Sequence, residues 1–364
     1  MASPAETAPV AGPPAHAPPS GRLRILDSLR GIAALSVVLF HMTKAFDSPD
    51  FFPGYPKAIY SFSAGSYGVW LFFVISGFVI LWTIGRAHRW RDFGISRFAR
   101  LYPPFWASLI LVTVVILLVQ AEGLGGSRPF ELTLPQFLAN ATMVPQWLGY
   151  KPIDGVYWTL TIEMGFYILI SLMFVAKLLR RDRIVWAMTI FWFVDIVVFS
   201  ALTKASGSSL HDIADFSYLF IAGMAYFLLW EGVARPRWLL WALFVQMPFV
   251  DLLRGHWVVV AIDVAILLVV HFAVSGKLSF LEWAPFLFLG RISYSLYLVH
   301  STLGYLTQRW LLEHGVERNL AVVLTVAGAI GLAVVFNKVV ERRVSPWVRN
   351  SLTSSKPEHR RSDA

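Results

Sequence analysis

Three ionisable residues, Asp27, Arg30 and His41, lie in the first apolar stretch of the chain, where a charge within a bilayer is costly and marks a candidate site. Arg30 and His41 are eleven residues apart, about three helical turns, so in a helix both project from one face roughly 16 Å apart. A guanidinium stays charged and binds oxyanions through paired hydrogen bonds, whereas an imidazole can take a proton near neutral pH. An Arg and a His on one stripe therefore favour a catalytic role over a structural one.

A second polar stripe occurs in the fourth apolar segment. Thr159, Glu163 and Tyr167 recur every four residues, which places them on one helix face. By the helical rise, Glu163 lies about 20 Å from the cytoplasmic edge of a core about 30 Å thick, and His41 lies at about 24 Å. We therefore expect Glu163 to orient His41 and to stabilise its protonated form.

The ninth apolar segment is also polar on one side. It carries Arg291, Tyr294, Tyr297 and His300. By the same arithmetic His300 lies at about 21 Å, whereas Arg291 and Arg30 lie at only about 8 Å. The two histidines are thus predicted in the outer half of the membrane and these two arginines in its inner third.

This polarity of charge suits the transfer of a group across the membrane. Arginines near the cytoplasm, extended by Arg97 and Arg100 on an inner loop, suit a phosphorylated or carboxylated donor. A histidine base further out would activate an acceptor there. Residue types and spacing do not identify the group that is transferred.

The elements that position these residues are predicted to be membrane-spanning helices. Of 364 residues, 57% are apolar and 15% charged, with a mean hydropathy of +0.61, which excludes a soluble globular or disordered chain. We predict an all-α, polytopic membrane protein with about ten transmembrane helices. The predicted spans are 25–43, 67–84, 102–120, 156–176, 184–202, 214–231, 237–252, 257–274, 286–306 and 319–337.

The distribution of basic residues predicts the orientation of these spans. The chain has 31 Lys and Arg against 22 Asp and Glu, a net charge of +9. With a cytoplasmic N-terminus, 21 basic residues fall in inner loops and tails and 8 in outer segments, which predicts both termini in the cytoplasm. Because these residues are spread over many short loops instead of one face, no nucleic-acid partner is expected.

The domain organisation follows from the same composition. We predict a disordered cytoplasmic tail over 1–21, a transmembrane domain over 22–349 and a second disordered cytoplasmic tail over 350–364. The sequence has no Cys, which excludes disulfide scaffolds, thiolate metal sites and Cys nucleophiles. No metal site is expected.

Five short blocks occur in order between residues 26 and 300. They are Leu26–Ala34 followed by His41, Phe72–Ile80, Arg97–Pro103, Tyr157–Glu163 with Phe166 and Tyr167, and Ile292–His300. Together they resemble the motifs of the acyltransferase-3 family of integral membrane O-acyltransferases, and they extend over nearly the whole chain.

The resemblance implies the transfer of an acyl group, often acetyl, from cytosolic acyl-CoA to a hydroxyl of a sugar or another acceptor. It implies that Arg30 and His41 are essential and that Arg97 and Arg100 contact the CoA phosphates. Acyl-CoA is then a co-substrate, and no bound cofactor is expected. Some members of the family carry a C-terminal esterase-like domain, and this chain is expected to be a stand-alone form. The acceptor would reach the membrane directly or be presented by a glycan-assembly protein.

Our leading hypothesis makes His41 the general base, supported by Glu163, with Arg30 completing the catalytic set. Arg97, Arg100 and Arg291 would bind the donor. The residues expected to line the pore or the acceptor site are Ser76, Tyr167, Tyr294, Tyr297 and His300. A covalent acyl-histidine step at His41 stays open.

The acceptor is expected to be a glycan or lipid-linked sugar of the cell envelope, because the predicted long outer loops and the outer His41 suit an extracytoplasmic acceptor. A small molecule such as a macrolide is the alternative acceptor. A membrane transporter, in which the polar stripes line a path, and a membrane-bound sensor or scaffold are alternatives from other classes. The bacterial inner membrane is the expected location.

Overall fold

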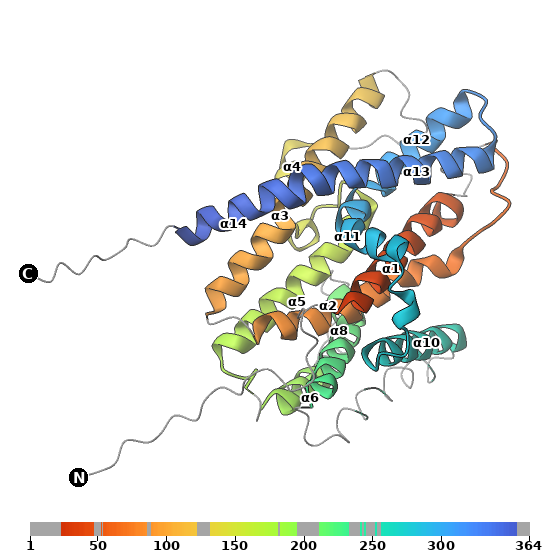
Figure 1. The fold of residues 1–364 in the computed structure, drawn as a ribbon. Coiled ribbons are helices and arrows are strands. Elements are labelled where there is room, and N and C mark those ends of the chain that lie inside the picture. The colour runs from red at the N-terminus through yellow and green to blue at the C-terminus, as the bar shows by residue number, and fades with distance from the viewer. Residues whose placement is uncertain are drawn as a thin grey trace, which may run out of the picture.

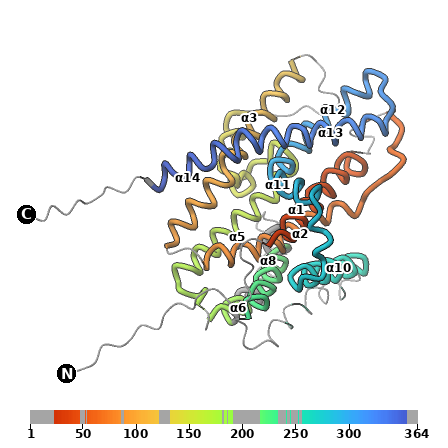
Figure 2. The backbone as a smooth tube through the Cα atoms, viewed as in Figure 1, coloured from red at the N-terminus to blue at the C-terminus, as the bar shows by residue number. Residues whose placement is uncertain are grey.

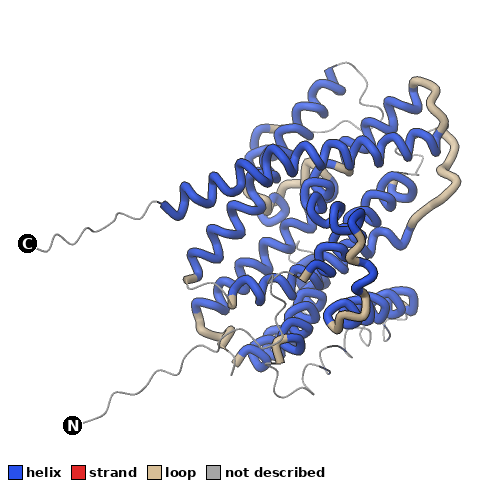
Figure 3. Tube along the Cα trace, viewed as in Figure 1, coloured by secondary structure: helices blue, strands red, loops and turns tan. Residues whose placement is uncertain are grey.

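The structure is a bundle of helices. The computed structural model describes residues 23–46, 52, 54–85, 89–121, 132–180, 183–194, 211–232, 241, 244, 252 and 256–354. Within these ranges every regular element is helical and none is a strand (Figures 1 and 3). The all-α prediction is therefore confirmed for this part of the chain.

The α-helices vary in length from short connecting pieces to long rods. They are α1 (Arg24–Phe40), α2 (Gly68–Ile84), α3 (Trp90–Ala121), α4 (Leu134–Ala141), α5 (Trp158–Val175), α6 (Ile184–Val194), α8 (His211–Trp230), α10 (Trp257–Val274), α11 (Ala284–Val299), α12 (Ser301–Glu313), α13 (Arg318–Phe336) and α14 (Ser345–Ser354). Two wider π-helical turns extend this set: His41–Ala45 continues α1, and Asn337–Val344 joins α13 to α14. Figure 2 shows α13 and α14 as one long rod, and it lies against α11 and α3.

Six helical stretches are long and apolar enough to cross a bilayer. They are Arg24–Ala45, Ser63–Ile84, Trp90–Ala121, Gly155–Val175, Trp257–Val274 and Arg318–Thr353, and two shorter apolar helices cover Phe216–Trp230 and Ala284–Val299. These correspond to eight of the ten predicted spans. The number of ten and the cytoplasmic placement of both termini remain predictions.

Parts of the other predictions fall outside the described residues. These parts are the tail over 1–21, residues 195–202 of the fifth span, most of the seventh span over 237–252, and residues 355–364. At the C-terminal end, α14 continues through Ser354, so the helix extends into the segment predicted as a tail.

The third helix begins twelve residues earlier than predicted. It starts at Trp90 and runs through Pro103 and Pro104 without interruption. Phe93, Arg97 and Leu101 are buried at intervals of four, so one face of this first part packs against the bundle. The prediction that Arg97 lies on an inner loop is therefore wrong, and Arg100, one turn further along α3, is helical too.

The predicted span 286–306 is interrupted at its centre. Helix α11 ends at Val299 and α12 begins at Ser301, so His300 is the junction residue of both. The side chain of His300 is fully buried. The break leaves helix-terminal backbone groups beside a polar side chain inside the bundle, a feature tolerated at membrane depth only where protein surrounds it.

Two glycine contacts bring the helices of the bundle close together. A Cβ atom on Gly290 of α11 would lie 2.0 Å from the carbonyl oxygen of Asp27 on α1, and a Cβ on Gly223 of α8 would lie 1.9 Å from that of Val74 on α2. Only a residue without a side chain permits such an approach. The first contact sets Arg291, the next residue on α11, against the helix that carries both Arg30 and His41.

The segment between α3 and α5 folds back against the bundle. The Tyr102 hydroxyl donates to Thr142 O at 3.0 Å, and Trp106 Nε1 donates to Ala141 O at 2.8 Å. Tyr102 and Trp106 lie at the middle of α3, so α4 ends halfway along that helix rather than beyond its tip. These bonds hold the end of α4 against α3, and the chain that follows contains buried residues, Met143 and Asp154 among them, and exposed ones such as Leu148 and Tyr150.

Candidate active site

Two pockets meet inside the bundle. The first has a cavity volume of about 60 Å³ and the second about 450 Å³. The residues that line both are Arg30, Val79, Arg100, Ser293 and Tyr294. Because these residues border both, the two pockets are neighbours between α1, α2, α3 and α11. We call the first the arginine pocket and the second the mouth pocket.

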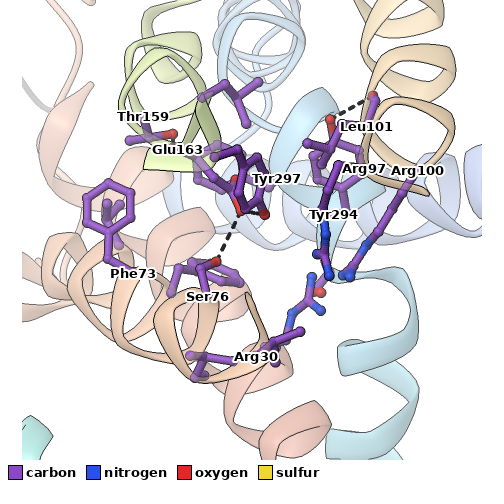
Figure 4. A pocket seen from close by; sticks show the side chains of 17 residues that line it. Arg30, Phe73, Ser76, Arg97, Arg100, Leu101, Thr159, Glu163, Tyr294 and Tyr297 are labelled. Carbon is purple, nitrogen blue, oxygen red and sulfur yellow. Dashed lines mark hydrogen bonds between the residues drawn. The ribbon is translucent and has the colours of Figure 1, made fainter. Parts of the chain in front are cut away.

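The arginine pocket takes its name from Arg30, Arg97 and Arg100, which line it together with Glu163. Figure 4 shows the guanidinium ends of the three arginines turned toward one another from α1 and α3. Three permanent cations and one carboxylate leave an excess of positive charge. Such an excess in a partly enclosed space attracts an anionic ligand.

Glu163 has its hydrogen-bond partners within this pocket. Its Oε1 atom accepts from the Ser76 hydroxyl at 3.1 Å and from the Tyr167 hydroxyl. The expected interaction of Glu163 with His41 is not among the hydrogen bonds of the described residues, and Glu163 lies instead with the arginines. Helical depth places two residues on one level but does not fix which way each faces across the bundle.

Arg97 is anchored more tightly than the other two arginines. Its side chain is buried, Nη2 donates to the Thr83 hydroxyl, and the guanidinium carbon lies 5.5 Å from the centre of the Tyr167 ring and 5.4 Å from that of Phe93. Arg100 is exposed toward the shared space. Arg97 thus holds a fixed charge at the pocket wall, while Arg100 can adjust to a ligand.

The mouth pocket is lined by Asp27, Arg291, Glu341 and Arg342 in addition to the shared residues. Glu341 accepts hydrogen bonds from the backbone N–H of Ser295 at 3.1 Å and from its hydroxyl, and Asn337 Nδ2 donates to Arg291 O at 3.0 Å. The π-helical turn therefore holds α11 at the point where Arg291 borders the pocket. Sequence reasoning did not identify Glu341, Asn337 or Arg342: Asn337 is the last residue of the predicted span 319–337, and the other two lie beyond the predicted spans.

His41 and His300 form a pair at the other end of α1 and α11. Nε2 of His300 lies 3.2 Å from Nδ1 of His41, and the ring centroids are 5.0 Å apart. Sequence reasoning expected both residues at similar depth but gave them separate roles. The π-helical turn that begins at His41 is a rare element that often occurs at functional sites.

Backbone carbonyls define the tautomers of this pair. Nδ1 of His41 lies 2.9 Å from Val37 O, and Nδ1 of His300 lies 2.8 Å from Tyr297 O. Because a carbonyl oxygen only accepts, we assign the hydrogen of each neutral ring to Nδ1. The single Nδ1–H of His41 is then shared between Val37 O and His300 Nε2, and the lone pair of His41 Nε2 is left for chemistry.

Two of the predicted tyrosines line the arginine pocket, and one of them, Tyr297, also lies beside His300. The Tyr294 hydroxyl donates to Leu101 O at 2.9 Å, and the Tyr297 hydroxyl donates to Val156 O at 3.1 Å and lies 2.7 Å from the Thr159 hydroxyl. The Tyr297 ring lines the pocket, and its centroid lies 5.6 Å from that of His300. Tyr297 therefore separates the end of the pocket from the histidine pair.

The structure thus divides the predicted site residues into three groups. The arginine pocket contains Arg30, Ser76, Arg97, Arg100, Glu163, Tyr167, Tyr294 and Tyr297; the mouth pocket adds Arg291; and His41 and His300 form the pair. Within the described residues no group of three or more His, Asp or Glu could hold a metal ion.

One buried carboxylate near the histidines was missed. Asp154 is fully buried, and it caps the start of the turn before α5 by accepting from Val156 N at 3.2 Å. An Asp directly before a helical segment is a recognisable capping signal. That signal predicts a helix start and does not indicate a position beside a catalytic residue.

Comparisons with known proteins point to one family. The family described as "Acyltransferase domain" matches residues 23–338. MdmB of Streptomyces mycarofaciens, named as an acyltransferase, is 27% identical over 160 residues, which are 44% of this chain and 41% of that protein. YrhL of Bacillus subtilis, whose name assigns it provisionally to peptidoglycan O-acetyl transfer, is 25% identical over 319 residues, 76% of this chain and 47% of that protein.

A Staphylococcus aureus (strain COL) protein whose name assigns it provisionally to O-acetyl transfer is 26% identical over 184 residues, which are 47% of this chain and 28% of that protein. The matched part of the chain therefore spans less than half the length of each of these curated relatives. No solved structure matches the chain.

Proposed function

The chain belongs to the acyltransferase-3 family, and from that premise we propose that it transfers an acyl group, specifically acetyl, from acyl-CoA to a hydroxyl of a cell-envelope or exported glycan. The names of the relatives support an acyltransferase and an O-acetyl group. They do not favour the transporter alternative.

The observation that carries this proposal is the pair of neighbouring cationic pockets, one of which is lined by Tyr297, whose ring lies 5.6 Å from that of His300. Five arginines border these pockets: Arg30, Arg97, Arg100, Arg291 and Arg342. A coenzyme A thioester carries several phosphate charges at one end and a neutral acyl thioester at the other. Its charged end matches the arginines, and its uncharged end would then point along Tyr297 toward His300 and His41.

The proposed reaction uses the free lone pair on His41 Nε2. This atom takes the proton of the acceptor hydroxyl as the oxygen forms a bond to the thioester carbonyl carbon. The carbon–sulfur bond then breaks, and the proton on Nε2 passes to the leaving thiolate. The products are the ester and free coenzyme A, so atoms and charges balance. His300 accepts from Nδ1–H throughout and keeps the His41 ring in place.

The cellular setting follows from the same proposal. The long apolar helices and the family are those of a multi-pass integral membrane protein. We place it in the bacterial inner membrane with the mouth pocket toward the cytosol, where acyl-CoA is available. The acceptor is a glycan or lipid-linked sugar on the outer side, reaching the bilayer directly or through a glycan-assembly protein.

The test measures free coenzyme A released by the purified protein in lipid vesicles supplied with acetyl-CoA and an envelope glycan fraction. Because the chain has no Cys, a thiol-reactive dye reports the product without background from the protein. We expect His41→Gln to abolish release. The matched control is His271→Gln on α10, a histidine that borders neither pocket. Full release by His41→Gln, or substrate movement without release, would contradict the proposal.

The acceptor is identified in cells. Mass spectrometry and NMR of envelope glycans, with and without the gene, should show acetyl groups that disappear with the gene and return with the wild-type chain. Their return with His41→Gln would contradict the role of His41, and unchanged glycans would contradict a glycan acceptor.

A further inference from the structure

The protonated form of His41 requires a negative charge that Glu163 does not supply. Glu163 bonds to Ser76 and Tyr167 inside the arginine pocket. His300 is a neutral partner whose Nδ1 is already engaged by the backbone. An imidazolium formed during the reaction would therefore be poorly stabilised by these two residues alone.

Asp154 is a buried carboxylate held between two helix starts. One oxygen accepts from Val156 N at 3.2 Å, at the turn that leads into α5, and the other accepts from Thr302 N at 3.0 Å, in the first turn of α12. Both helix starts direct partial positive charge at the carboxylate. Thr302 lies two residues after His300, so this carboxylate binds the backbone of the α11–α12 junction.

Asp154 ends an irregular segment that begins after α4. Asn140 at the end of α4 is buried; its Oδ1 accepts from Ile153 N at 2.9 Å, and its Nδ2 donates to Lys151 O at 3.1 Å. Met143, close behind, has a positive φ of 68° and almost no exposure. A buried non-glycine residue in that conformation is uncommon and indicates a constrained backbone in this segment.

Asp154 is linked to the histidine pair through the backbone: it binds Thr302 N, two residues after His300, and His300 Nε2 lies 3.2 Å from His41 Nδ1. The other titratable or charged side chains on the elements packed against the His41 turn are Arg24, Asp27, Arg30, Tyr67, Tyr305, Arg309, Glu313 and Arg318, with Lys44 on the turn itself and His300 paired with His41. Asp27 and Glu313 are the carboxylates in that set; Asp27 lines the mouth pocket, and Glu313 is paired with Arg309 at 2.8 Å. Asp154 is therefore the buried carboxylate placed to compensate a cation on His41.

We propose that Asp154 is a positioning residue for the histidine pair: it fixes the junction that carries His300, and its negative charge stabilises protonated His41. This inference rests on the proposed acyl transfer with His41 as base. It assigns to Asp154 the electrostatic part that the sequence had suggested for Glu163.

Two variants separate charge from architecture. Asp154→Asn is nearly isosteric and neutral, and Asp154→Ser is neutral but keeps a side chain suited to cap the start of α5. The matched control is Asn140→Ser, which removes an uncharged buried hydrogen bond in the same segment. The readouts are kcat, the KM for acetyl-CoA, the pH profile of kcat, and the unfolding temperature in detergent.

We expect both Asp154 variants to lower kcat about tenfold or more while the KM for acetyl-CoA changes less than about twofold. The acid limb of the kcat profile should move to lower pH by about one pH unit, because an imidazole without a nearby carboxylate gives up its proton more readily. Asn140→Ser should lower the unfolding temperature and leave the acid limb in place.

Three outcomes would overturn the inference. The first is an unchanged acid limb in both Asp154 variants, which would reduce Asp154 to a structural cap. The second is the loss of folded protein in both variants, which would assign Asp154 to the fold itself. The third is a shift in the acid limb of Asn140→Ser as large as that of Asp154→Asn. A wild-type chain that releases no coenzyme A would contradict the proposed function instead, so the two failures are distinguishable.

Discussion

The arginine pocket lies between α1, α2, α3, α5 and α11, whereas the histidine pair lies at the ends of α1 and α11, and the two regions are built in opposite ways. Around the pocket, Arg30 and Arg100 face a space that the protein leaves open, and charge of one sign accumulates. At the pair, each Nδ1 is bound by a backbone carbonyl, and His300 has no solvent exposure. The arginine side chains can adjust to the position of a ligand, whereas the hydrogen bonds of the pair hold the His41 ring, and with it Nε2, in one place. We infer that the first region binds and the second reacts.

This difference predicts two kinetic signatures. Loss of a charge that holds the donor equally in the ground state and the transition state raises KM, whereas loss of a group that acts only in the transition state lowers kcat. The arginines should also respond to salt, because solvent-accessible charges are screened. The histidines should not.

The largest effect is expected at the reacting atom. His41→Gln should lower kcat about 10²- to 10⁴-fold, the range for loss of a general base, with the KM for acetyl-CoA unchanged. Initial rates of thiol release over a range of acetyl-CoA concentrations provide both constants. A raised KM with normal kcat would place His41 in the binding region and remove the contrast between the two regions.

The next effect is expected at the pocket wall. Arg100→Gln should raise the KM for acetyl-CoA about tenfold to hundredfold, equivalent to about 1.4–2.7 kcal/mol, with kcat little changed. The wild-type KM should rise with salt, and that rise should be weaker in the variant. Arg349→Gln on α14, an exposed arginine that borders neither pocket, is the control. Equal effects of Arg349→Gln and Arg100→Gln would indicate a general surface charge effect.

Sequence reasoning predicted those parts of this architecture that depend only on the local order of residues along the chain. Most span boundaries follow from local hydropathy, and the shared face of Arg30 and His41 follows from helical period alone. The family match over residues 23–338 includes all five sequence blocks found between residues 26 and 300. These features require no knowledge of how the helices pack.

The features that sequence reasoning missed depend on packing. The start of α3 at Trp90 follows from burial of Phe93 and Arg97 against neighbours, and depth arithmetic did not reveal that Glu163 faces the arginines. The break at His300 is stabilised by Asp154, which is far away in the sequence. The order of residues along the chain does not show which way a helix face turns or which distant residues come into contact.

A third prediction concerns the interface that carries both regions. Gly290→Ala would place a Cβ 2.0 Å from Asp27 O, so α1 and α11 must separate, at a cost of about 1–3 kcal/mol in the free energy of unfolding. Because α1 carries Arg30 and leads into His41, and α11 carries Arg291 and leads into His300, kcat should fall and KM should rise together. Unfolding in detergent and steady-state kinetics measure both effects.

The control for this prediction is Gly331→Ala on α13, where a Cβ meets open space. It should leave stability and kinetics unchanged. A Gly290→Ala protein that lost only one of the two kinetic constants would show that the two regions do not share this interface.

The smallest effect is expected at the exposed start of α13. It tests whether loss of activity in acid reflects unfolding of the protein. Glu317 caps α13 by accepting from Asn319 N and Leu320 N, both at 2.9 Å, and these backbone hydrogen bonds lower the pKa of its carboxyl below the usual value. A lowered folded-state pKa contributes stability at and above the unfolded-state pKa, and this contribution is lost as pH falls through the lowered value. Glu317→Gln should therefore slightly reduce the unfolding temperature at neutral pH, with the difference from wild type vanishing in acid.

Because this cap is exposed and is not part of the histidine pair, its loss should not move the acid limb of activity. Unfolding curves and kcat profiles of wild type and Glu317→Gln should show an unchanged acid limb of activity in the variant. If the acid limb moved with the stability of the α13 cap, acid inactivation would reflect unfolding, and the pH dependence assigned to the histidine pair would belong to the fold.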